Sequence, residues 1–212
     1  MRTEGSAAVV DAALAAGVGR LVQESVCMLY ADGGDAWLDE GAPTDRYPTA
    51  EGNHAAEANA RRFGDAGGIG VILRLGWFYG PGAAHSEQML AQARHHVILT
   101  IGDPAGYQSS IHMTDAGSAV AAALDVAGGT FNVVDDEPLT KRDFADALAG
   151  AAGRAPWVRG PGRVAGRFGD HLTSLTRSVR ASNTRFRSAC GWAPRYPSAR
   201  EGWMATAQAL SA

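Results

Sequence analysis

A nearly uninterrupted apolar run at residues 70–75 is the feature that most constrains how this sequence can fold. The run reads Gly-Val-Ile-Leu-Arg-Leu, with Arg74 as its single charge, and it lacks the alternation of a half-exposed strand. Such a run predicts a parallel strand that is buried on both faces. Shorter strands are predicted at 20–25, 97–100 and 130–134.

Helical segments separate these predicted strands. We expect helices at about 5–16, 52–63, 86–95, 114–126, 141–152 and 199–210. Thr140 and Asp143 form a capping-box pattern at the start of one of them, and Ser198 and Glu201 repeat it at the last. Thr114 is the expected N-cap of another. Strands that alternate with helices of about 10–15 residues predict βαβ units, and so an α/β fold with a parallel sheet.

Charge is uneven along the chain, whose formal net charge is −3. Residues 1–150 carry nine basic and twenty acidic side chains, whereas residues 151–212 carry ten arginines and two acids. A basic C-terminal part that docks on an acidic N-terminal part explains this pattern, and so does a phosphate-bearing ligand held between them. We expect no nucleic-acid partner, because no helix-turn-helix or aromatic-interleaved pattern accompanies the arginines.

Several protein classes are not expected. No apolar run approaches the ~18 residues of a membrane helix, and the N-terminus has no secretory-signal pattern. We therefore expect a cytoplasmic protein without membrane association. Cys27 and Cys190 lie far apart and near no histidine cluster, so neither a metal site nor a disulfide framework is predicted.

Five segments occur in an order that is typical of a known protein family. They read GVGRLVQES…LYADGG, VILRLGWFYGPG, SSIHMTDAGSAVAAAL, GGTFNVVDDEPLTKRDFADAL and CGWAPRYPSAREGW. Together they resemble the C-terminal two-thirds of extended short-chain dehydrogenases/reductases of the NAD-dependent epimerase/dehydratase type. The resemblance implies a partial doubly wound, Rossmann-like parallel sheet that binds NAD or NADP. It divides the chain into 1–150, the C-terminal half of the Rossmann-like domain with interleaved substrate-region segments, and 151–212, a mainly helical, basic substrate region.

The family's glycine-rich phosphate-binding turn, which follows its first strand, has no counterpart in this sequence. By the resemblance, roughly 90 residues would precede residue 1, so an N-terminally truncated chain is expected. The glycine-rich segment 64–70 is not that turn, because it follows a predicted helix and precedes a strand, the reverse of the required order. Without earlier strands, 20–25 would be an open sheet edge, and we expect a homo-oligomer or a partner that covers it.

The family's catalytic pair, a tyrosine and a lysine four residues later, is replaced. The resemblance places Thr49 at the tyrosine position and Asn53 at the lysine position. Thr49 has no acidic proton near neutral pH, and Asn53 carries no charge. Ser25 and Tyr30, near the end of a predicted strand, are the alternative catalytic candidates, with strand capping and aromatic packing as their competing structural roles.

Two further positions follow from the resemblance. Gly76, Trp77 and Phe78 match the family's loop near the nicotinamide and are the predicted cofactor-binding residues. The two aromatic side chains either form the wall of a pocket for a ring or belong to the core. The segment 107–110 lacks the arginine of nucleotide-sugar enzymes, which argues against such a substrate. The only lysine of the chain, Lys141, lies in a later predicted helix, away from the catalytic segment.

The sequence leaves three functional hypotheses open. The first is an NAD(P)-binding, epimerase/dehydratase-like oxidoreductase with a rearranged site for a small-molecule substrate. The second is a non-catalytic dinucleotide-binding or regulatory module, since the Tyr/Lys pair is missing. The third is an inactive fragment.

Overall fold

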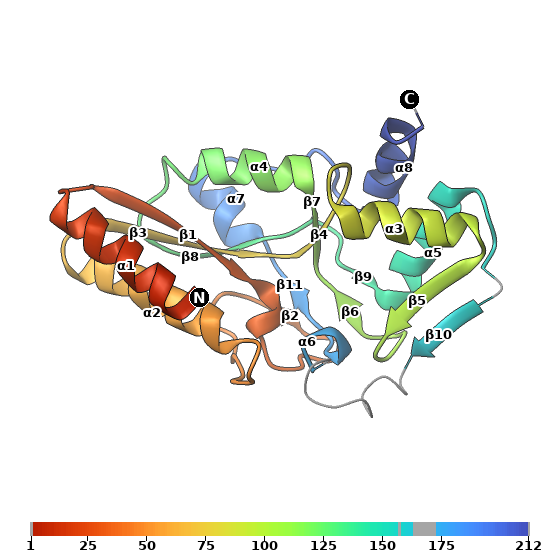
Figure 1. Ribbon diagram of the computed structural model, residues 1–212, viewed down its shortest axis with the longest axis horizontal. Coiled ribbons are helices and arrows are strands. Elements are labelled where there is room, and N and C mark those ends of the chain that lie inside the picture. Colours follow the sequence, from red (N-terminus) through yellow and green to blue (C-terminus); the bar gives the residue numbers. More distant parts are fainter. Residues whose placement is uncertain (1, 157, 163–172, 212) are drawn as a thin grey trace.

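The central element is a three-stranded parallel sheet in the order β1–β3–β8. Its strands are β1 (Arg20–Val26), β3 (Ile69–Leu75) and β8 (Gly129–Val133), shown in Figure 1. The computed structural model describes residues 2–156, 158–162 and 173–211. The middle strand β3 is the apolar run of the sequence, and it pairs in parallel with both neighbours. The predicted buried parallel strand is confirmed.

Helices cover both faces of this sheet. One face carries α1 (Arg2–Ala15) and α2 (Glu51–Asp65), and the other carries α4 (Met113–Ala122) and α7 (Thr184–Cys190), as Figure 1 shows. Side chains of β3 alternate between the faces, because successive strand residues point in opposite directions. Val71, Leu73 and Leu75 pack into a core with Phe186 of α7, whereas Arg74 reaches α2. Helices on both faces of a parallel sheet confirm the doubly wound, Rossmann-like α/β arrangement.

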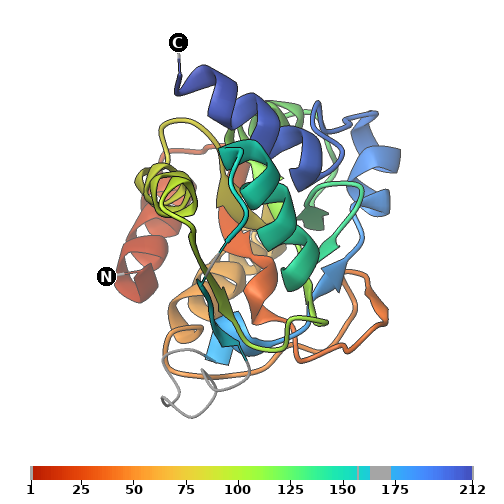
Figure 2. The same cartoon turned by 90° about the vertical axis from the view of Figure 1, so that its right-hand side faces the viewer.

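A smaller layer of helices lies beside the carboxyl ends of β1 and β3. It contains α3 (Ala84–Arg94), α5 (Lys141–Ala152), α8 (Ala199–Ala209) and the parallel pair β5 (Val97–Ile101) and β10 (Val158–Gly162). Figure 2 looks onto this layer, with α5 and α8 toward the viewer. Its core includes Leu90, Ile98, Phe144, Leu148 and Trp203.

Short elements connect the sheet to this layer. The strand pairs are β2 (Trp37–Leu38) with β11 (Arg180–Ala181), β4 (Trp77–Tyr79) with β7 (Ser110–His112), and β6 (Tyr107–Gln108) with β9 (Leu139–Thr140). A 3-10 turn, η1 (Cys27–Leu29), follows β1, and α6 (Thr173–Thr176) precedes β11. Strands of two or three residues are too short to show a period, so the sequence did not predict them.

Most predicted helices are confirmed, and two details of α4 are wrong. The helix ends at Ala122 rather than at residue 126, and its N-cap is His112, whose Nδ1 accepts a hydrogen bond from the Thr114 backbone N–H. A ring nitrogen thus takes the place of the expected hydroxyl. The predicted caps Thr140 and Ser198 each accept a backbone N–H bond at the start of α5 and α8. The segment 64–70 joins α2 to β3, which confirms the helix-to-strand order.

Arginines of the C-terminal segment pair with acids of the N-terminal segment. Arg177 contacts Asp45 at 2.8 Å, and Arg187 contacts Asp136 at 2.6 Å. These pairs confirm that basic and acidic parts of the chain dock on each other. Within the described ranges, no helix is long and apolar enough to cross a membrane.

A buried ion pair fastens α2 to the sheet. The guanidinium of Arg74 donates two hydrogen bonds to the carboxylate of Glu57, at 2.8 and 2.9 Å. The side chains of the two residues are 6% and 1% exposed. Burial alone would raise the pKa of Glu57, but the hydrogen bonds and charge of Arg74, with help from Ser25 and Arg61, hold it below its usual value.

We expect Glu57→Gln to lower the free energy of unfolding by about 3–5 kcal/mol, because it leaves the buried guanidinium of Arg74 without its counter-charge. Urea unfolding at neutral pH measures the change. Glu51→Gln is the matched control. Glu51 lies in the same helix but pairs with Arg46 at the surface, where such a pair contributes about 0–1 kcal/mol. Equal losses in the two variants would contradict the prediction.

The same pair predicts an acid-sensitive stability. The lowered pKa of Glu57 means that its contribution is fully present above the unfolded-state pKa of about 4.3 and is lost as pH falls through the folded-state value. Urea midpoints measured from neutral pH downward should therefore fall more steeply in the unsubstituted protein than in Glu57→Gln. If the urea midpoints of the two proteins fell equally with pH, the Glu57 carboxylate would not be the source of the acid sensitivity.

Candidate functional site

Two adjoining cavities lie beside the carboxyl ends of β1 and β3, the edge at which open α/β sheets bind ligands. The larger one, of about 180 Å³, extends between α3, β5 and α5. The smaller one, of about 30 Å³, is closer to the strand ends. Both are lined by Trp77, Gln108, Lys141 and Leu175. The shared walls make the two cavities one candidate site.

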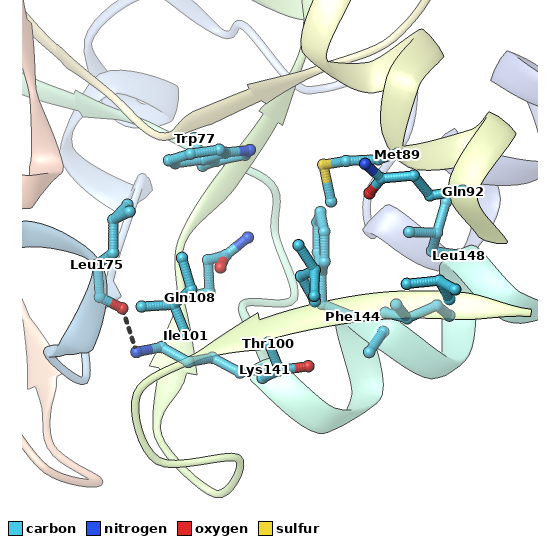
Figure 3. Close-up of a pocket in the computed structure, with 14 residues that line it drawn as sticks. Trp77, Met89, Gln92, Thr100, Ile101, Gln108, Lys141, Phe144, Leu148 and Leu175 are labelled. Atoms are coloured by element: carbon cyan, nitrogen blue, oxygen red, sulfur yellow. Dashed lines mark hydrogen bonds between the residues drawn. The ribbon is translucent and has the colours of Figure 1, made fainter. Parts of the chain in front are cut away.

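The walls of the larger cavity are predominantly apolar. They include Met89, Val97, Ile98, Leu99, Ile101, Phe144, Ala145 and Leu148. Gln92, Thr100, Gln108 and Lys141 are the polar residues among them. Figure 3 shows Trp77 at one end of this cavity and Lys141 along another wall, with the ring of Phe144 between α3 and α5.

Of the three predicted cofactor residues, Trp77 is the one that lines the cavities. A Cβ at Gly76 would lie 2.7 Å from the carbonyl carbon of Ser110, so the glycine is needed for the close approach of two backbones. Phe78 packs against the core between the sheet and α4. The indole Nε1 of Trp77 is buried and has no hydrogen-bond partner among the described residues. The indole therefore contributes its ring to the walls of the cavities, while its N–H is buried within the protein.

Lys141 is the charged residue that lines both cavities, and the sequence analysis did not assign it to the site. It is the first residue of α5, is 4% exposed, and donates from Nζ to the backbone carbonyl of Leu175 at 2.6 Å. Burial lowers its pKa to about 8, although the negative charges of Asp32 and Asp103 act in the opposite direction. At Gly102, where φ is +89°, a Cβ would lie 2.5 Å from this ammonium group. The one sequence signal for this site was that the chain contains no other lysine.

The catalytic candidates Ser25 and Tyr30 are both fully buried. Ser25 Oγ donates to Oε1 of Glu57 at 2.7 Å. The Tyr30 hydroxyl donates to Oδ1 of Asn132 at 2.7 Å, and burial raises its pKa far above the usual range. Neither residue is among those that line the two cavities. Their hydroxyls therefore serve buried partners within the protein.

Residues 49 and 53 lie where the family resemblance placed the catalytic pair. Thr49 is exposed in the turn before α2, and Asn53 is buried in the first turn of that helix. Neither is among the described residues that line the cavities.

Cys27 and Met28, which follow β1 directly, line the smaller cavity. The thiol of Cys27 donates to the carbonyl of Arg74 at 3.1 Å, and burial raises its pKa far above the usual range. This thiol is therefore a protonated wall of the site rather than a nucleophile. Their place at the end of a predicted strand was the signal that could have identified them.

The described residues supply walls for only one part of a dinucleotide. Cys27, Met28 and Trp77 are apolar and aromatic walls at the strand ends, but the space of about 30 Å³ that they line would hold only part of a nicotinamide ring. Within the described ranges, the glycine-rich segment 64–70 runs from helix to strand and so cannot cradle a pyrophosphate. In the same ranges, no group of three or more His, Cys, Asp or Glu residues could hold a metal ion.

Comparison with known proteins identifies a relative in sequence. No family model matches the chain. A Streptomyces protein named 3-diazoavenalumate denitrifying reductase is 37% identical over 214 residues, which cover 95% of this chain and 69% of the relative.

Solved structures share the fold. A human epimerase family protein with NADPH matches with a TM-score of 0.85 at 21% identity, over 98% of this chain and 72% of that chain. The UDP-glucose 4-epimerase of Thermus thermophilus with NAD matches with a TM-score of 0.80 at 25% identity. The match covers 98% of this chain and 68% of that chain. Sequence and structure agree, and the chain belongs to the NAD-dependent epimerase/dehydratase family of extended short-chain dehydrogenases/reductases.

Proposed function

We propose that this chain carries the substrate site of an NAD(P)H-dependent reductase that acts on a small organic molecule. The observation that carries the proposal is the pair of largely apolar cavities at the carboxyl ends of β1 and β3. The name of the Streptomyces relative, a reductase, supports the reaction class. The human and Thermus structures, with NADPH and NAD, support the cofactor class.

The lining of the site favours a compact apolar substrate over a nucleotide sugar. The segment 107–110 contributes Gln108 to the cavity and no arginine. The hydroxyl of Ser109 already donates to the carbonyl of Val179. An apolar cavity of roughly 150 Å³ is enough for a benzene ring, so the larger cavity suits one ring-sized group.

The protein's contribution to the chemistry is to hold the substrate and exclude water. A bound reduced nicotinamide supplies a hydride to an electrophilic atom of the substrate. Trp77 and Cys27 form apolar walls beside the reacting end of the site. Thr49 and Asn53 cannot deliver a proton as a phenol beside an ammonium does. We therefore propose electrophiles whose reduction needs no proton donor at that position.

The rest of the cofactor site is part of the proposal. We propose that residues preceding this chain supply the glycine-rich turn, and that this chain is an N-terminally truncated form. In this proposal, residues 1–150 form the C-terminal half of the Rossmann-like domain, and residues 151–212 form the substrate region. The outer edge of β1, which has no strand partner within the described ranges, would pair with the earlier strands. In the short form it would be covered by a second copy or a partner.

The intact mass of the protein made from its own chromosomal locus tests the truncation. A mass about 10 kDa above 22.0 kDa is expected, since the preceding βαβ units would add that much. A mass of 22.0 kDa would contradict the proposed N-terminal segment and direct the search to a partner at β1.

We expect the protein from that locus to oxidise NADPH or NADH in the presence of aryl diazonium compounds, which a hydride converts to the arene and N2 without a proton, and not of UDP-glucose. Trp77→Ala should lower kcat/KM at least tenfold, because it removes a wall of both cavities. Trp37→Ala is the matched control, since Trp37 is 52% exposed and lines neither cavity. Absorbance of the reduced nicotinamide follows the reaction. Cofactor binding without turnover of any substrate would instead favour a non-catalytic module.

Ser25→Ala and Tyr30→Phe test the predicted catalytic role of these hydroxyls. Both hydroxyls donate to buried acceptors, so each variant should lose about 1–2 kcal/mol of unfolding free energy. We expect kcat to change less than tenfold. A loss of kcat above a hundredfold in a variant with an unchanged melting temperature would show that the hydroxyl takes part in the reaction.

A further inference from the structure

We propose that Lys141 is the anchor for a carboxylate, and that the substrate of the larger cavity is a flat aryl acid whose ring lies among the apolar walls. The inference rests on the proposed function in one respect, that the two cavities hold the substrate. It adds the chemical class of that substrate and the residue that selects it.

The first argument is that Lys141 is buried without a direct ion pair. An ammonium group that is removed from water is costly unless a counter-charge and several hydrogen bonds replace the solvent. Lys141 is 4% exposed, and the carbonyl of Leu175 is the partner that its Nζ has among the described residues. No carboxylate forms an ion pair with it within the described ranges, although Asp32 and Asp103 act on its charge from farther away. An ammonium has three donors, so it retains capacity for a bound anion.

The second argument is the position of this charge in the fold. Lys141 is the first residue of α5, where the helix dipole disfavours a cation and favours an anion. Its backbone N–H donates to the carbonyl of Gly106, which fixes the start of the side chain. Residues that oppose local stability in this way are expected at functional sites.

The third argument is the shape of the cavity beside the ammonium. Ile101, Phe144 and Leu175 line the larger cavity next to Lys141, and Trp77 closes its other end, as Figure 3 shows. The volume of about 180 Å³ suits one aromatic ring. One cation in an apolar, ring-sized cavity matches one carboxylate on an aryl group.

Binding of trans-cinnamate and of trans-cinnamamide tests the proposal, because the two probes share a shape and differ in charge. Isothermal titration of the protein measures both dissociation constants, with and without NADPH. Cinnamate should bind at least tenfold more tightly than cinnamamide. Lys141→Met should weaken cinnamate roughly 10- to 100-fold, as expected for a lost charged hydrogen bond, and should leave cinnamamide within about twofold. Lys141→Arg should retain part of the preference.

Arg142→Met is the matched control for net charge, because Arg142 is the next residue and is exposed. It should leave both affinities unchanged. The melting temperature of Lys141→Met separates anchoring from a structural role: we expect it to be unchanged or higher, since a buried charge is replaced by an apolar chain of similar length. A clear loss of stability together with equal loss of both probes would assign Lys141 to the fold and overturn the proposal.

The affinity for cinnamate should also depend on pH. Lys141 is positively charged at pH values below its pKa of about 8. Cinnamate, a carboxylate, is ionised at every pH above about 5. Its dissociation constant should be flat below pH 8, rise toward tenfold per pH unit above it, and level off at the higher pKa that Lys141 has beside the bound anion. The charged groups that face this ammonium are Asp32, Asp103 and, across the smaller cavity, Arg177. Cinnamamide should show no such bend.

The outcomes separate this inference from the proposed function. Selective loss of cinnamate in Lys141→Met supports the anchor even if no substrate oxidises NADPH. Oxidation of NADPH with equal affinity for the two probes would overturn the anchor while the reductase proposal stands. Failure of the unsubstituted protein to bind cinnamate would also overturn it.

Discussion

The buried ion pair between Glu57 and Arg74 is the interaction on which the rest of this structure depends. It joins α2 to the central strand β3, and the hydroxyl of Ser25 brings β1 to the same carboxylate. Two charges removed from water stabilise a fold only when they meet with correct geometry. The pair therefore fixes how α2 lies on the sheet, and with it the edge at which β1 and β3 end together.

The candidate site follows from that edge. Cys27 and Met28 come directly after β1, and Trp77 comes two residues after β3, so the chain delivers these walls at the strand ends. The layer of α3, α5 and β5 then covers them and encloses the larger cavity. Lys141 enters this apolar space at the first turn of α5, where the helix dipole disfavours a positive charge. The geometry thus combines a rigid scaffold with one group that opposes local stability, a combination expected where a ligand binds.

Parts of the fold could be predicted because they follow local rules. The apolar run of β3 and the capping residue Thr140 act within a few residues of the chain, so their effects are visible in sequence. The cap at His112 was missed because a histidine ring nitrogen replaced the usual hydroxyl. Of the residues that line the cavities, Trp77 is the one that the sequence analysis had assigned to a binding site. The other walls come from segments as far apart as Cys27 and Leu175, and no local pattern brings them together.

The sequence by itself determined the α/β class, the alternation of strands and helices, and the absence of a tyrosine and a lysine at positions 49 and 53. Periodicity and residue identity are properties of the chain and need no partners in space. The tertiary structure alone decided that Ser25 and Tyr30 donate to buried partners and that Lys141 faces an apolar cavity. Burial and hydrogen bonding depend on which distant segments pack together, and so they arise only when the chain has folded.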